Sequence, residues 1–103
     1  ADLMARAGRA PPQVFEAHEL VMFAKGCHHR RTPEDNARGR AALEQAVELD
    51  PEYALAHAWL ACTIAQAFVF HRDPSVFAEA KGHAVRARAL NDDESECHRV
   101  LAA

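Results

Sequence analysis

The chain has 103 residues, of which half are apolar and 26% are charged, and its formal net charge is −3 at pH 7. This composition fits one small globular domain, and the negative charge argues against nucleic acid as a partner. Three well-separated cysteines exclude a disulfide framework and favour a cytoplasmic location, while the lack of an 18-residue apolar run gives no reason to expect a membrane.

The first two predicted segments are a basic arm and an amphipathic helix. Residues 1–12 are small and basic and end in two consecutive prolines, which cannot continue a helix, so we expect a linker or N-terminal arm. From Val14 onward, apolar residues recur at intervals of three and four, which predicts a helix over residues 13–29. The helix ends in HHRR, where cations suit the negative end of the helix dipole.

The second predicted helix has clear start and stop signals. Thr32 is a favourable N-cap, and Pro33 stands at the first helical position. Asp35 occupies the place that a capping box gives to an acid. The helix should run to about Leu49, because the Asp-Pro pair that follows cannot continue it.

Three further helices complete the prediction. The first covers residues 53–70 and is apolar around most of its circumference, so it should lie in the middle of the packing. Asp73 and Pro74 then predict a helix over residues 74–90, and a fifth helix is expected over 93–103. We therefore predict an all-α fold in which short joints make neighbouring helices antiparallel.

Two similar segments of the sequence indicate that these helices form repeats. Residues 46–61 read AVELDPEYALAHAWLA and residues 87–102 read ARALNDDESECHRVLA, with matching helix breaks. A helical hairpin buries one face by itself, and a stacked second copy buries the other, so internal repeats of this kind predict a solenoid. The domain, residues 13–103, should then hold two helix pairs, 13–50 and 53–91, and the first helix of a third.

The segment ALEQAVELDPEYALAHAWLA resembles a junction between tetratricopeptide repeats (TPRs), in which a Leu-Asp-Pro stop precedes a helix with a Leu-Gly or Leu-Ala pair. The resemblance implies a short right-handed superhelix of stacked antiparallel helical hairpins. Small side chains at the packing positions would let the helices approach closely. The residues that match those positions are Gly26, Gly39, Leu43, Ala46, Pro51, Leu60, Ala61, Ile64, Ala80, Ala84 and Ala87.

The same resemblance implies a concave groove lined by the first helix of each pair. In this family such a groove binds proteins or peptides, and here its lining would be mostly apolar with a basic end. The residues that would line it are Leu20, Phe23, Cys27, Arg30, Arg31, Leu55, Ala58, Cys62, Ala65 and Gln66. Cys27 and Cys62 would hold equivalent positions on neighbouring helices.

These expectations lead to a non-enzymatic scaffold for protein–protein or interdomain contacts. The sequence shows no nucleophile elbow, phosphate loop or paired acid and base, and no cofactor or metal is expected. The last predicted helix has no following helix, so it should expose Val100 and Leu101 and let two copies pair as a homodimer. The chain begins without Met and ends inside this helix, so we expect it to be a piece of a longer protein.

Two alternatives remain open. The run RRTPEDNARGRAALEQAVELDPEYALAHAWLA is similar to the TPR segment of some bacterial signalling proteins, where it follows an adenylate cyclase domain or a winged-helix DNA-binding domain. That similarity implies a regulatory or oligomerisation segment of such a protein. Seven histidines and three cysteines suggest instead a metal- or redox-responsive helical domain. However, the adjacent Cys27, His28 and His29 point about 100° apart on a helix and cannot share one ion.

Overall fold

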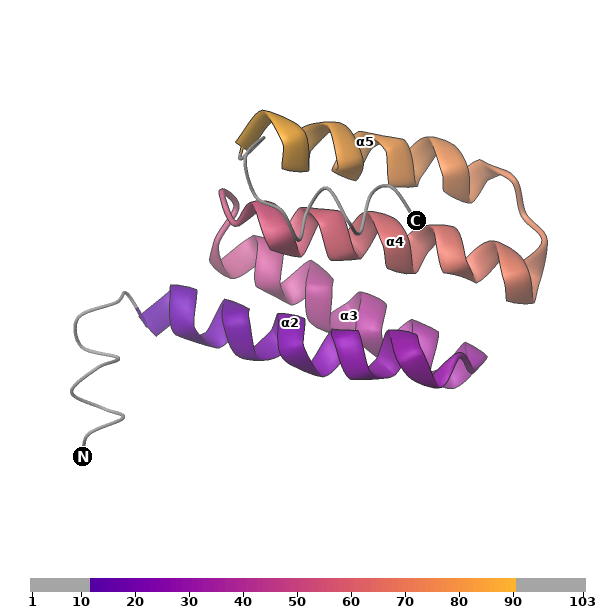
Figure 1. Ribbon diagram of the computed structural model, residues 1–103, viewed down its shortest axis with the longest axis horizontal. Coiled ribbons are helices and arrows are strands. Elements are labelled where there is room, and N and C mark those ends of the chain that lie inside the picture. The colour runs from indigo at the N-terminus through magenta and orange to yellow at the C-terminus, as the bar shows by residue number, and fades with distance from the viewer. Residues whose placement is uncertain (1–11, 91–103) are drawn as a thin grey trace.

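Four helices make up the part of the chain that the computed structural model describes, residues 12–90 (Figure 1). They are α2 (Pro12–Arg30), α3 (Pro33–Leu49), α4 (Ala54–His71) and α5 (Ser75–Leu90). Consecutive helices run in opposite directions (Figure 1). No strand occurs between residues 12 and 90, so the predicted all-α class is confirmed there.

The helix bounds lie within one residue of the predicted bounds. Pro12 was predicted to belong to the arm but is the first residue of α2, where the missing N–H of proline removes no helical hydrogen bond. The remaining arm, residues 1–11, and the predicted fifth helix over 93–103 lie outside the described residues. The predicted homodimer contact through that helix lies outside them as well.

The start of α3 follows the capping prediction. The Thr32 hydroxyl accepts a hydrogen bond from the Asp35 backbone N–H at 3.0 Å and donates one to Asp35 Oδ2, also at 3.0 Å. The Nε atom of Arg30 lies 3.2 Å from the same carboxylate oxygen. The hydroxyl and, to a smaller extent, Arg30 hold the pKa of Asp35 below its usual value. This cluster ties the end of α2 to the first turn of α3.

α4 lies at the centre of the described fold and packs against each of the other three helices (Figure 1). It carries no Asp, Glu, Lys or Arg, and ten of its residues are buried. By length and composition alone α4 could cross a membrane, but 56% of it is buried inside the protein. Its apolar circumference is therefore explained by its central position, as the sequence predicted.

α2 and α3 pack tightly where Gly39 faces Cys27. A Cβ atom on Gly39 would lie 3.1 Å from Cys27 Cβ and 3.6 Å from the carbonyl oxygen of Ala24. A larger residue would therefore push the two helices apart. Gly26 does not share this role, because a Cβ atom there would approach only Arg30 of its own helix, at 3.5 Å. The prediction that Gly26 permits close helix packing is wrong.

The other predicted packing residues lie mainly in the core. The buried ones are Leu43, Ala46, Leu60, Ala61, Ile64, Ala80 and Ala87. Ala84 is half-buried against this core, and Pro51 is exposed in the turn that follows α3. Alanine supplies most of the buried hydrophobic positions, which lets the helix backbones lie close together.

α5 buries few side chains. Ala80 and Ala87 are its two buried residues, against ten in α4. A polar contact adds to its attachment, because Arg40 of α3 pairs with Glu79 of α5. At the joint that leads into α5, the rings of Phe68 and Phe77 lie with centroids 5.0 Å apart.

Candidate functional site between α2 and α4

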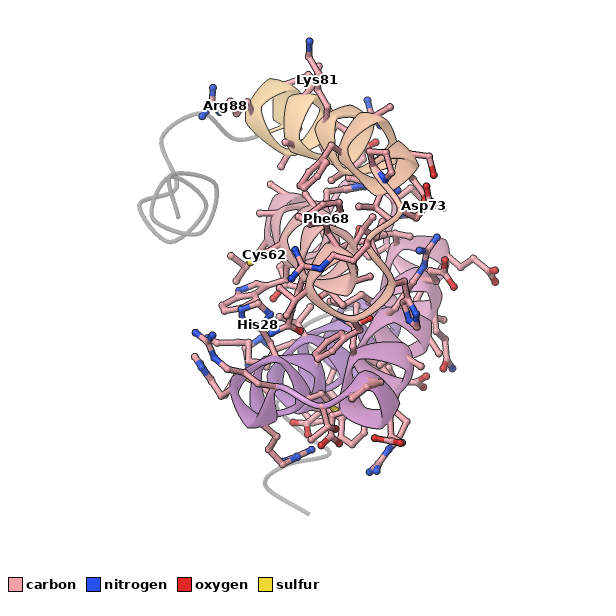
Figure 2. All side chains as sticks on the ribbon, turned by 90° about the vertical axis from the view of Figure 1, so that its right-hand side faces the viewer. His28, Cys62, Phe68, Asp73, Lys81 and Arg88 are labelled. Carbon is pink, nitrogen blue, oxygen red and sulfur yellow. The ribbon has the colours of Figure 1, made fainter. Side chains whose placement is uncertain are left out.

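The last turn of α2 contacts α4 through His28. The Nε2 atom of His28 lies 3.6 Å from the Sγ atom of Cys62, and its ring lies edge-on to Trp59 with centroids 5.6 Å apart. The backbone carbonyl of His28 accepts a hydrogen bond from Gln66 Nε2 at 3.0 Å. Figure 2 shows His28 and Cys62 on the same side of the molecule. A histidine, a thiol and an indole therefore meet where α2 adjoins α4.

Asn36 of α3 extends this contact into the core. Its side-chain Nδ2 donates to the backbone carbonyl of Thr63 at 2.9 Å and to Oε1 of Gln66 at 3.0 Å. Asn36 is buried, and a buried amide needs such partners because an unpaired one costs stability. One path of hydrogen bonds thus runs from α3 through Gln66 to the end of α2. Neither Asn36 nor His28 was among the predicted site residues.

The electrostatics of the His28–Cys62 pair argue against an activated nucleophile. Burial lowers the pKa of His28, and the charges of His29 and Arg31 lower it further. Burial also raises the pKa of the Cys62 thiol. At neutral pH the pair is therefore a neutral imidazole and a protonated thiol, whereas cysteine chemistry requires a thiolate.

The described residues offer few ligands for a metal ion. Within residues 12–90, no group of three or more His, Cys, Asp or Glu side chains is placed to hold one. His28 and Cys62 together supply two ligands, whereas a structural zinc site takes four. The alternative of a metal- or redox-responsive domain gains no support from this site.

The residues predicted to line one groove lie in different environments. Cys27 and Ala58 are 1% and 0% exposed, so the prediction that they face an open surface is wrong. Phe23 and Arg30 contact side chains of α3. Four residues of the predicted set are half-buried and pack against the core: Leu20, Leu55, Cys62 and Ala65. Of the predicted set, Cys62 and Gln66 meet α2, and Arg31 is exposed just beyond it.

The predicted equivalence of Cys27 and Cys62 is also wrong. Cys27 packs against α3 beside Gly39, while Cys62 faces α2, and both are free thiols. A shift of one residue turns a helical side chain by about 100°. A repeat spacing one residue shorter than the distance between Cys27 and Cys62 would pair Cys27 with Ala61. Both of these residues are buried.

An exposed edge remains beside the His28–Gln66 contact. α2 and α4 run in the same direction (Figure 1). Three residues beyond that contact, the chain presents an exposed Arg31 after α2 and an exposed Val69 on α4. Val69 is 63% exposed, and His29 is exposed as well. We name the exposed positions Arg31 and Val69, together with His29, whose ring lies edge-on to Trp59 of α4, the α2–α4 edge.

No protein-family model, no curated protein and no solved structure significantly matches this chain. The resemblance to TPRs therefore rests on the motif residues of the sequence. What the chain does has to be inferred from its packing and its surface.

Proposed function

We propose that the chain is a TPR-like, non-enzymatic module for protein–protein or interdomain contacts, built as a short right-handed stack of helical hairpins. The observation that carries this proposal is the packing of α4, which contacts both helices of the preceding hairpin as well as its own partner, α5. Hairpins that stack in this way are the unit of a solenoid, and solenoids use their extended surfaces for binding.

Two local features support the proposal. The close contact of Gly39 with Cys27 meets the need of stacked helices for small residues. The neutral state of the His28–Cys62 pair favours a packing role for these side chains over a chemical one.

We assign the partner contact to the α2–α4 edge. The exposed Val69 offers apolar surface, and Arg31 offers a charged group with several hydrogen-bond donors. A separate protein and another domain of a longer parent chain would both fit this edge. The cytoplasmic location and the setting in a bacterial signalling protein remain predictions from the sequence.

Affinity capture, with this chain as the bait, tests the proposal by comparing two matched double variants. Arg31→Glu with Val69→Glu changes the α2–α4 edge, while Val85→Glu with Arg86→Glu makes the same two changes at exposed positions of α5. Both variants should unfold at the wild-type temperature. We expect the wild type and the α5 variant to retain the same bound partner, and the edge variant to lose it. Equal retention by both variants would contradict the assignment of the edge.

A further inference from the structure

Two histidines stack across the interface between α4 and α5. The rings of His57 and His83 have centroids 5.9 Å apart and planes inclined by 26°. His57 is 8% exposed, and His83 is half-buried. This pair lies apart from the His28 contact, because it joins α4 to a different helix.

The hydrogen bonding of His57 fixes the position of its proton. Its Nε2 atom lies 2.8 Å from the carbonyl oxygen of Pro51. A carbonyl oxygen only accepts, so Nε2 carries the proton in the neutral ring. The Nδ1 atom is buried and has no hydrogen-bond partner among the described residues. The His57 ring is therefore held by one hydrogen bond and by its stack on His83.

Charged groups of α3 and α5 face the same pair. Arg40 and Glu44 of α3 and Glu79 of α5 all act on His83. Arg40 pairs with Glu44 at 3.0 Å and also with Glu79. Burial is the largest cause acting on the pKa of His83 and the net direction is downward, although Glu79 and Glu44 raise this pKa and Arg40 lowers it.

We propose that the His57–His83 stack is a pH-sensitive latch that holds α5 on α4 at neutral pH and releases α5 when His83 is protonated. α5 suits such a release, because within the described fold it buries two small side chains. Release would uncover the side of α4 that carries His57 and Phe68. This regulation goes beyond the proposed scaffold role and does not depend on which partner binds.

The electrostatics of His83 agree with this direction. Burial is the largest cause that lowers the pKa of His83, and the charge of His57 lowers it further. A histidine whose pKa is lower in the folded state binds its proton more readily once released. The stabilisation is therefore complete above the ordinary value of 6.5 and declines as the pH falls from there toward the lowered pKa.

Hydrogen exchange of the full chain, measured by mass spectrometry and corrected for intrinsic exchange rates, tests the latch. Between about pH 7.5 and about pH 5.5, which spans the titration of histidine, peptides of α5 should lose protection more than peptides of α3. We expect this difference because a histidine whose pKa is lowered by folding loses its stabilising effect as the pH falls. His57→Gln with His83→Gln should abolish it, whereas His71→Gln, at an exposed histidine, should leave it unchanged.

An equal loss of α5 protection in the wild type and in the double variant would overturn the latch. If the double variant does not fold, NMR titration of His83 in the unaltered chain still decides. A pKa below the ordinary 6.5 supports the latch, and a pKa at or above 6.5 contradicts it.

Discussion

The side-chain amides of Asn36 and Gln66 form a hydrogen bond of 3.0 Å between α3 and α4. Gln66 also donates to the backbone carbonyl of His28, so the two amides connect three helices. Hydrogen bonds in a protein interior are strong and directional. We infer that this path sets how the α2–α3 hairpin meets α4, while the alanine-rich core supplies most of the attraction.

Replacement of Asn36 should therefore destabilise the fold. Asn36→Leu removes the donor that serves Gln66 Oε1 and the Thr63 carbonyl, and we expect the free energy of unfolding to fall by about 1–3 kcal/mol. Gln45→Leu makes a matched change at an exposed position of the same helix and should stay within about 0.5 kcal/mol of the wild type. Urea denaturation measures both. Equal stability of the two variants would contradict the claim that the hydrogen bonds of Asn36 stabilise the fold.

Two glycines allow a matched test of helix packing. Gly82→Ala should raise the free energy of unfolding by about 0.5–1 kcal/mol, because a Cβ atom there meets nothing within 4 Å and alanine favours the helix. Gly39→Ala should instead lower it by about 1 kcal/mol, since the new Cβ atom would crowd Cys27. Thermal unfolding compares the pair. A stabilised Gly39→Ala variant would show that α2 and α3 do not pack as closely as described.

The cap of α3 gives a further prediction. Thr32→Ala should cost about 0.5–2 kcal/mol of unfolding free energy, because the Asp35 N–H loses its acceptor, while Thr32→Ser should retain most of the stability. The lowered pKa of Asp35 stabilises the fold above the ordinary value of 3.8, and this stabilisation is lost as the pH falls through the lowered pKa. The difference between Thr32→Ala and wild type should therefore shrink in strong acid. Urea denaturation at neutral and acidic pH checks this, and a constant difference would contradict it.

The thiol of Cys62 should react slowly. Burial raises its pKa, and the thiolate is the reactive species. We expect iodoacetamide to label Cys62 more slowly in the folded chain than in urea, because unfolding removes the burial that raises its pKa. Mass spectrometry of the labelled peptides separates Cys62 from Cys27. Equal rates in the folded and unfolded chain would restore the redox-responsive alternative.

The helices could be predicted because their signals are local. The Thr32 cap and the Pro51 stop lie within a few residues of the bounds they determine, and the apolar circumference of residues 53–70 predicted the central position of α4. The class of fold follows from these elements. Their stacking into a TPR superhelix required a resemblance to a family and stays a proposal.

The contact between α2 and α4 could not be predicted in the same way. Asn36 continues the buried stripe of Gly39, Leu43 and Ala46 at helical spacing, so a polar residue among core positions was the available signal. Its partners lie 27 and 30 residues away, and no local pattern identifies them. The misplacement of Cys27 had a similar cause, because an error of one residue in the register turns a core side chain outward.

The most direct test of the scaffold proposal is an NMR titration of the isotope-labelled chain with the captured partner. We predict that the backbone amide signals of His29, Arg31 and Val69 shift, while those of Val85 and Arg86 on α5 do not. Shifts confined to α5, or no shifts at all, would contradict the claim that the chain is an interaction module that binds its partner at the α2–α4 edge.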